Sequence, residues 1–326
     1  MSTTRVAAID CGTNSIRLLA ADVDPVAGTL TELDRRMEIV RLGQGVDRTG
    51  RLATDALDRT LAACERYAGV VRDLGITRVR MVATSATRDA ANASEFVQGV
   101  HGVLGVDPEV VEGAEEAALS YLGATRELAG RDDLAWPFLA VDIGGGSTEF
   151  VRASEGGAVR ARSVDVGSVR LTERHLADDP PLAAQVESAS RDIDAAIALA
   201  DEAVGLSDAG TLLGLAGTVT TLGGIALDLP AYDSARIHHS RMPAARVHEI
   251  TRDLLRMSHA ERAANAVIHP GRVDVIGAGA LILDRIVSYT GVPEVLVSEH
   301  DILDGIAWSL VDQERRHNVE SDITRP

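Results

Sequence analysis

The amino-acid sequence predicts an α/β fold in which mixed β-sheets are flanked by helices and divided between two packed halves. Its 326 residues exceed the roughly 100–200 residues of an ordinary domain. Strand-like and helix-like segments alternate along the chain, which is the pattern of α/β proteins. One short glycine-containing motif also occurs twice, near the N-terminus and near the middle. We therefore expect two domains of related structure.

The composition excludes several classes of protein. Hydrophobic residues make up 45%, charged residues 25% and aromatic residues 3%, which rules out disordered, collagen-like and disulfide-scaffold proteins. The only cysteines are Cys11 and Cys64, and the apolar runs are shorter than the ~18–20 residues that span a membrane. The first residues lack the apolar stretch of a secretion signal. We expect a cytoplasmic protein that binds no membrane.

The charged residues limit the chemistry and the partners. All 32 basic residues are arginine, so a P-loop lysine and a Schiff-base lysine are both excluded. The 49 acidic residues give a net charge of −17, which argues against nucleic acid as a partner. Arginine binds phosphate oxygens in pairs, so a polyanionic substrate is compatible with this composition where arginines converge.

The first copy of the repeated motif, Asp-x-Gly-x-x-Ser, begins at Asp10. An apolar strand precedes it and an alternating run over 16–23 follows it, which predicts a β-hairpin with exposed backbone N–H groups in its turn. The candidate phosphate-binding residues of this turn are Gly12, Thr13, Asn14, Ser15 and Arg17. Asp10 is a candidate metal ligand, whereas Arg17 taken alone also suits the surface of a strand.

The rest of the first half alternates between strands and helices. We expect strands over 37–42, 79–84 and 108–112 and helices over 54–74, 89–104 and 114–128. Arg88 leaves a strand at its C-terminal end, where α/β sheets bind ligands. It is a candidate phosphate clamp, although an arginine at the start of a helix also suits the surface.

Two adjacent carboxylates, Glu115 and Glu116, lie at the start of the helix predicted over 114–128. Acidic residues in a first turn complement the helix dipole, which is a purely structural explanation. Alternatively, one of the two orients a water molecule for in-line attack on a terminal phosphorus.

The second copy of the motif runs from Asp142 to Glu149. Consecutive glycines allow close backbone approach and leave N–H donors for oxyanions. The candidate phosphate-binding residues are Gly144, Gly145, Gly146, Ser147 and Thr148. Asp142 and Glu149 flank the turn and could hold a divalent cation. A tight hairpin with a solvated glutamate is the structural alternative.

The remaining chain completes the second domain. A polar stretch before Trp136 predicts the passage between domains, so we expect domains over 1–129 and 130–326. The predicted strands lie over 158–166, 211–215 and 294–297, and the predicted helices over 182–204, 219–227, 243–257, 271–289 and 302–316.

Both motifs and the Glu115-Glu116-Ala117 step resemble the exopolyphosphatase/guanosine pentaphosphate phosphohydrolase (Ppx/GppA) family, which belongs to the acetate kinase, sugar kinase, Hsp70 and actin superfamily. The resemblance continues through 41–52, 83–88, 167–173 and 214–222 and so covers nearly the whole chain. It implies two ribonuclease H-like domains around a central cleft, with the last helix, about 302–316, packing back on the first domain.

The resemblance also implies roles for individual residues. Glu116 corresponds to the family's catalytic base, and Mg²⁺ or Mn²⁺ is implied, with Asp142, Glu149 and Asp10 as ligands; Glu149 alternatively positions the water. Secondary candidates for binding the rest of the substrate are Arg170, Gly217, Thr218 and Arg272. One departure concerns residues 301–305, which lack an arginine that many members carry; this puts a phosphate or nucleotide contact from that turn in doubt.

The activity implied by the resemblance is exopolyphosphatase: a water activated by Glu116 removes the terminal phosphate of inorganic polyphosphate. We expect short chains to be favoured, because the sequence lacks the extra helical domains of longer relatives. Hydrolysis of the 5′-terminal phosphate of guanosine pentaphosphate would use the same residues. A sugar or carboxylate kinase is less favoured, since it needs an acceptor pocket. A non-catalytic sensor of polyphosphate or guanosine tetraphosphate is the alternative from another class, and family likeness suggests a homodimer.

Overall fold

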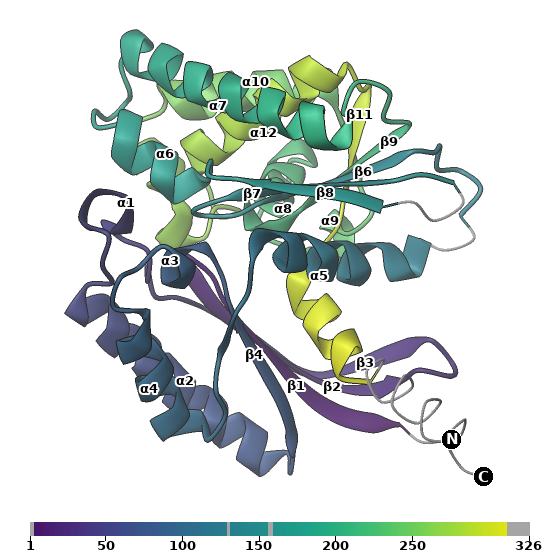
Figure 1. The fold of residues 1–326 in the computed structure, drawn as a ribbon. Coiled ribbons are helices and arrows are strands. Elements are labelled where there is room, and N and C mark those ends of the chain that lie inside the picture. The colour runs from purple at the N-terminus through teal and green to yellow at the C-terminus, as the bar shows by residue number, and fades with distance from the viewer. Residues whose placement is uncertain (1–2, 129–130, 156–158, 312–326) are drawn as a thin grey trace. The chain divides into compact units, whose positions relative to one another are not determined.

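The computed structural model describes residues 3–128, 131–155 and 159–311 and divides into two compact units, each with its own sheet (Figure 1). Unit 1 comprises the chain up to Glu112 and the chain from Ile302, and unit 2 runs from Gly113 to Asp301. The boundary predicted at 129/130 lies outside the described residues. The helix before it belongs to unit 2 rather than to the first domain, because its Ala117 and Ala124 pack in that unit's core.

The sheet of unit 1 has the strand order β3-β2-β1-β4-β5. Its strands are β1 (Thr4–Cys11), β2 (Ser15–Asp24), β3 (Thr29–Ile39), β4 (Arg78–Ala83) and β5 (Glu109–Val110). The first three are antiparallel, while β4 and β5 add in parallel. The prediction of a strand over 37–42 was wrong at both ends. Strand β3 is a mostly exposed edge strand, so its polar residues carry no apolar alternation that would reveal its beginning.

Helices α2 (Thr54–Asp73) and α4 (Ala93–Leu104) cover one face of this sheet. Alternate residues of β1, including Ile9 and Cys11, pack there against Tyr67 and Phe96. The short helices α1 (Val46–Thr49) and α3 (Ser85–Arg88) lie in the connections. Because neighbouring side chains of a strand face opposite sides, Asp10 points to the other face of the sheet.

The chain that returns to unit 1 is helical over 302–311; the last residues of the helix predicted over 302–316 lie outside the described residues. The Ser309 hydroxyl accepts a 2.7 Å hydrogen bond from Arg80 of β4. Asp304, which is 2% exposed, accepts one of 2.6 Å from Arg35 of β3. These contacts join the returning helix to the sheet of unit 1.

The sheet of unit 2 has the order β10-β11-β9-β6-β7-β8. Its strands are β6 (Phe138–Ile143), β7 (Thr148–Ala153), β8 (Val159–Val164), β9 (Thr211–Leu215), β10 (Arg241–Pro243) and β11 (Glu294–Val297). Strands β8, β7 and β6 are antiparallel, and β9 and β11 continue the sheet in parallel. Apart from the added edge strand β10, this strand order and these strand directions repeat those of the unit 1 sheet. The duplicated motif therefore marks the first hairpin of two sheets with the same ribonuclease H-like strand order.

Helices cover both faces of this second sheet (Figure 1). Leu139, Val141 and Ile143 of β6 pack on the side of α7 (Ala183–Val204), α8 (Ala216–Ala226) and α12 (Ile276–Thr290). The intervening residues Phe138 and Ala140 pack on the side of α5 (Gly113–Thr125). The remaining helical segments are η1 (Arg126–Leu128), α6 (Ser168–His175), α9 (Ser234–Ile237), α10 (Ala244–Arg256), α11 (His259–Ala263) and η2 (Pro270–Arg272). Among the described residues, no helix is long and apolar enough to cross a membrane.

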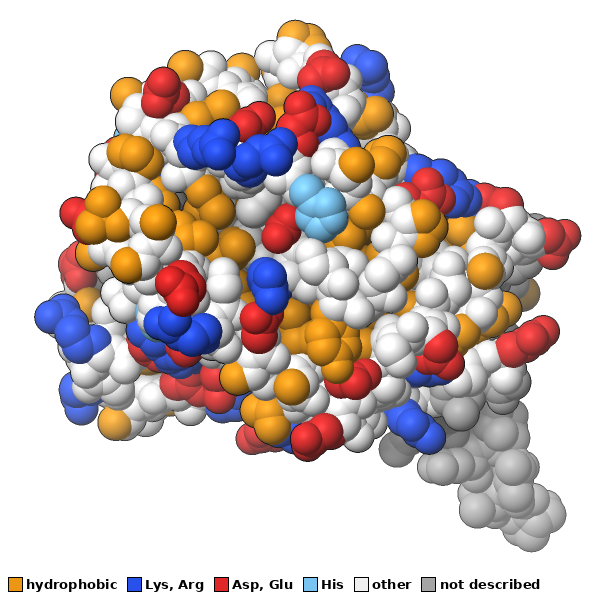
Figure 2. Space-filling view, turned by 90° about the horizontal axis from the view of Figure 1, so that it is seen from above, with side chains coloured by type: hydrophobic (Ala, Val, Ile, Leu, Met, Phe, Trp, Pro, Cys, Tyr) orange, Lys and Arg blue, Asp and Glu red, His pale blue; other side chains and the backbone are white. Residues whose placement is uncertain are grey.

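Acidic and basic side chains are interspersed on the outer face of unit 2 that carries α7, α10 and α12 (Figure 2). Some neighbouring groups form ion pairs there, such as Arg191–Glu187 and Arg285–Asp194. The positive charges of these two arginines are therefore offset by carboxylates.

Candidate active site

Three polar residues lie in a row across neighbouring strands of unit 2. Asp142 of β6 is directly opposite Glu149 of β7, and Glu149 is opposite Ser163 of β8. Residues opposite each other in a sheet share a face. Since Ala140 and Val151 of the same strands pack on the α5 side and side chains alternate, the row faces α5.

Helix α5 brings a third carboxylate to this row. Glu116 is 8% exposed whereas its neighbour Glu115 is exposed, so the helix buries the glutamate to which the resemblance assigns the role of base. Ser120 lies one turn after Glu116 on the same face of the helix. Its hydroxyl donates a 2.7 Å hydrogen bond to Oδ2 of Asp142, which ties α5 to β6 beside the carboxylates.

The start of α5 packs closely on β8. A Cβ atom at Gly113 would lie 2.4 Å from Cβ of Ser163, so only glycine allows this approach. The Ser163 hydroxyl in turn donates a 2.7 Å hydrogen bond to Oε1 of Glu149. Neither serine was among the residues predicted from the sequence. Ser120 had one local signal, its i+4 spacing from Glu116, whereas nothing local connects Ser163 with Glu149.

The electrostatics of the row follow from its burial. Burial raises the pKa of the Glu149 carboxyl well above its ordinary value, and the nearby Glu116 and Asp142 carboxylates raise it further. Hydrogen bonds from Ser163 and Ser147 oppose this shift. A group of buried carboxylates binds either protons or a hard divalent cation with oxygen ligands. The donor set thus fits Mg²⁺ or Mn²⁺.

The glycine-rich turn between β6 and β7 is held from one side by the start of α6. The carbonyl of Gly144 accepts the N–H of Ser168, and the carbonyl of Gly145 accepts those of Val169 and Arg170. Arg170 also donates through Nε to the carbonyl of Gly146 at 2.7 Å. The turn carbonyls therefore point toward α6. Within the described chain, the N–H groups of Gly145 and Gly146 donate to no protein group, as an anion site requires.

The side chain of Thr148 has a structural role. Thr148 is 1% exposed, and its hydroxyl donates a 2.6 Å hydrogen bond to the carbonyl of Val166. This bond uses its only donor hydrogen. Thr148 therefore fastens the hairpin, and its hydroxyl does not donate to phosphate in this conformation.

The secondary candidates Gly217, Thr218 and Arg272 lie near the same end of the sheet. Leu215, the last residue of β9, is opposite Asp142, and α8 begins immediately after it. Gly217 and Thr218 therefore lie in the first turn of a helix, rather than before one. The guanidinium of Arg272 rests on Gly217, where a Cβ atom would lie 1.3 Å from Nη1.

The first motif forms the corresponding turn of unit 1. Its backbone is fixed because the N–H of Gly12 donates to the Ser15 carbonyl at 2.9 Å and the Asn14 carbonyl accepts the N–H groups of Val40 and Arg41. The hydroxyls of Thr13 and Ser85 lie 2.9 Å apart and share a hydrogen bond.

The two charged candidates of this turn bind each other. Arg17 donates to Oδ2 of Asp10 through Nε at 3.0 Å and Nη2 at 2.7 Å, because the two residues are opposite each other on β1 and β2. The sequence instead predicts a phosphate ligand at Arg17 and a metal ligand at Asp10. Arg88 donates to the carbonyl of Val111 at 2.9 Å, so it also anchors the chain.

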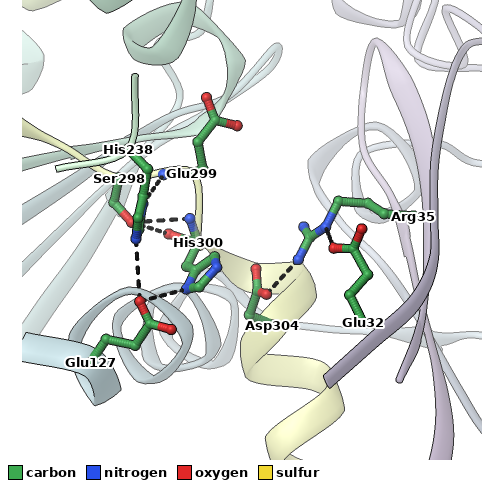
Figure 3. Close-up of polar contacts among 8 residues, drawn as sticks. All are labelled: Glu32, Arg35, Glu127, His238, Ser298, Glu299, His300 and Asp304. Atoms are coloured by element: carbon green, nitrogen blue, oxygen red, sulfur yellow. Dashed lines mark hydrogen bonds and ion pairs between the residues drawn. The ribbon is translucent and has the colours of Figure 1, made fainter. Parts of the chain in front are cut away.

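A separate cluster joins Glu127, His238 and His300 (Figure 3). Oε2 of Glu127 lies 3.2 Å from Nε2 of His238 and 3.3 Å from Nδ1 of His300. Nδ1 of His238 accepts the N–H of Glu299 at 3.1 Å, so a neutral His238 ring carries its proton on Nε2 and donates it to Glu127. A histidine nitrogen binds a metal through its lone pair, and a protonated Nε2 of His238 has none to offer. In this conformation the three side chains therefore form a hydrogen-bonded cluster.

Comparison with known proteins agrees with these motifs. The model of the Ppx/GppA phosphatase family matches residues 21–314. Exopolyphosphatase 2 of Mycobacterium tuberculosis is 48% identical over 321 residues, which cover 95% of this chain and 99% of that protein. Among solved structures, an exopolyphosphatase-like protein has a TM-score of 0.91 at 43% identity, covering 97% of this chain and 99% of the other. The Aquifex aeolicus family member has a TM-score of 0.79 at 29% identity, covering 96% and 99%. The chain therefore belongs to the Ppx/GppA phosphatase family.

Proposed function

We propose that this protein is an exopolyphosphatase that hydrolyses the terminal phosphoanhydride bond of inorganic polyphosphate. The observation that carries the proposal is the set of three buried carboxylates, Glu116, Asp142 and Glu149, at the edge of unit 2 where the glycine-rich turn presents its N–H groups. The 48% identical relative named Exopolyphosphatase 2 supports the same activity.

In the proposed mechanism, Glu116 accepts the proton of the attacking water, and Glu149 helps to hold that water. Gly145 and Gly146 donate their N–H groups to oxygens of the terminal phosphate, where charge develops in the transition state. Asp142 and Glu149 would hold Mg²⁺ or Mn²⁺, which when bound neutralises phosphate charge. Phosphoryl transfer to water needs positioning and charge neutralisation more than covalent chemistry, and this edge supplies both.

Two adjacent glutamates allow a matched test. We expect the wild-type protein with Mg²⁺ to release orthophosphate from polyphosphate. Glu116→Gln should lower kcat by at least ~100-fold, because the general base is lost, while polyphosphate binding persists. Glu115→Gln, which removes the same charge from an exposed neighbour, should keep the wild-type rate. The measurement is phosphate release from short chains, long chains and guanosine pentaphosphate in parallel.

Each alternative gives a distinct outcome in this experiment. Faster release from guanosine pentaphosphate would make the protein a nucleotide phosphohydrolase that uses the same carboxylates. Binding of polyphosphate by both proteins without any turnover would indicate a sensor and refute the proposed activity. Equal loss in Glu115→Gln and Glu116→Gln would refute the assignment of the base.

A further inference from the structure

We propose that Ser120 is a positioning residue for the reaction: by binding Asp142, it fixes helix α5, and with it Glu116, against the carboxylates of β6 and β7. The inference rests on the proposed function, because it assigns Ser120 a role relative to the proposed base and cation ligands. Ser120 is 1% exposed, and its hydroxyl lies 2.7 Å from Oδ2 of Asp142. A hydroxyl at this distance from a carboxyl oxygen makes a short hydrogen bond.

The short side chain of Ser120 makes this hydrogen bond sensitive to the distance between α5 and β6. A serine hydroxyl extends only two bonds from the backbone, so it reaches Asp142 only if α5 lies close to β6. Residues four apart on a helix are neighbours on one face, so the turn that holds Ser120 also holds Glu116. The Ser120–Asp142 bond therefore constrains where the Glu116 carboxyl lies along the row.

Other contacts of α5 with the sheet are made by apolar side chains, including Ala117, Ala124 and the partly buried Tyr121. Apolar contacts are non-directional, whereas a hydrogen bond requires its two atoms within a narrow range of distance and angle. The Ser120–Asp142 bond therefore adds a directional constraint to the apolar packing of the helix. Ser163 holds Oε1 of Glu149 in a similar way from β8, so a separate element orients each carboxylate.

The carboxylates would therefore take part in the reaction directly, whereas Ser120 would act only by positioning them. Partners that orient metal-binding carboxylates typically change metal affinity or activity by about 10–100-fold when removed. Because the phosphate-binding N–H groups belong to the turn and not to α5, loss of Ser120 should lower kcat much more than it raises KM for polyphosphate.

The test compares Ser120→Ala with Ser120→Thr, which keeps the hydroxyl. Thr125→Ala is the matched control, since the Thr125 hydroxyl on the same helix donates to the carbonyl of Tyr121 and not to a carboxylate. The readouts are kcat and KM for polyphosphate, the Kd of Mn²⁺ measured by electron paramagnetic resonance without substrate, and the thermal unfolding midpoint. Asp142→Asn is the reference for loss of the proposed cation ligand.

We expect Ser120→Ala to lower kcat and to weaken Mn²⁺ binding by about tenfold or more, with KM little changed. Ser120→Thr should recover most of both, and Thr125→Ala should match the wild type. Wild-type kcat and Mn²⁺ affinity in Ser120→Ala would overturn the proposal, as would equal losses in Thr125→Ala. Unchanged Mn²⁺ affinity in Asp142→Asn would refute the proposed cation site alone, and the split between kcat and KM would still decide the role of Ser120.

Discussion

At the scale of single residues, the site depends on carboxylates that are costly to bury. Glu149 is 2% exposed, and both its burial and the nearby Glu116 and Asp142 raise its pKa. The folded state therefore favours the protonated form of Glu149 more strongly than the unfolded chain does. Ionising it in the folded protein costs stability, as is common where function requires a buried charge.

This cost predicts that Glu149→Gln stabilises the metal-free protein. A raised pKa means that the wild type loses stability as the pH rises above the unfolded value of ~4.3 and approaches the folded value. At pH 8, the free energy of unfolding of Glu149→Gln should exceed that of the wild type, because only the wild type carries a buried carboxyl group that is costly to ionise. The difference should shrink toward pH 4, because the carboxyl of the unfolded chain also becomes protonated as the pH falls through its ordinary value of ~4.3. Urea unfolding with a metal chelator measures it.

The control is Glu115→Gln, whose exposed side chain should leave stability unchanged. Added Mg²⁺ should stabilise the wild type more than Glu149→Gln, because the proposed cation site is intact only in the wild type and binding stabilises the folded state. A Glu149→Gln protein less stable than the wild type at pH 8 without metal would contradict this interpretation.

At the scale of secondary-structure elements, the glycine-rich turn between β6 and β7 is shaped by the contact of this hairpin with α6. At Gly167, a Cβ atom would lie 2.4 Å from the carbonyl oxygen and 2.5 Å from the carbonyl carbon of Gly145. These are backbone atoms and cannot rotate away. Backbone N–H groups at the start of α6 donate to the carbonyls of the turn. The N–H groups of the turn therefore point away from α6.

Gly167→Ala should therefore separate α6 from the turn. We expect a loss of about 1–3 kcal/mol in the free energy of unfolding, as for other overpacked sites, and a higher KM for polyphosphate because the N–H donors shift. Gly102→Ala is the control, since it places the same methyl group on helix α4 with nothing within 4 Å and should be neutral or stabilising. Equal KM values for the two variants would show that α6 does not set the geometry of the turn.

At the scale of the whole molecule, the chain leaves unit 1, builds unit 2 and returns to unit 1. The returning helix is attached through Asp304, whose carboxylate is almost fully buried and binds Arg35 (Figure 3). Removing one partner of a buried pair leaves a buried charge with less compensation. Arg35 is itself 30% exposed, so solvent screening reduces the effect.

We expect Arg35→Met to lower the free energy of unfolding by about 1–3 kcal/mol. The adjacent Arg36→Met removes an exposed pair with Asp34, in which the side chains are 45% and 25% exposed, and should cost no more than ~0.5 kcal/mol. Chemical denaturation of both variants tests this. Equal stabilities would mean that the Arg35–Asp304 pair does not hold the returning helix.

Much of the fold was predictable because its signals are local. A strand followed by a glycine-containing turn and an alternating run is recognisable in any context, and both hairpins formed where the motif occurs. Register then follows from the hairpins, which bring Asp142 opposite Glu149. Strand β3 lacked such a signal, since most of its residues are exposed on both faces. The unit to which α5 belongs also had no local signal, because it depends on which sheet covers Ala117 and Ala124.

The sequence by itself determined the duplicated hairpins, the two mixed sheets and the carboxylate pair that flanks the glycine-rich turn, because turn chemistry and side-chain alternation depend only on neighbouring residues. Only the tertiary structure decided that Glu116 is buried while Glu115 is exposed, that Ser120 and Ser163 hold the carboxylates, and that Arg17 binds Asp10. These outcomes depend on which elements pack together and how closely. Such contacts join residues that are distant in sequence, and no local pattern records them.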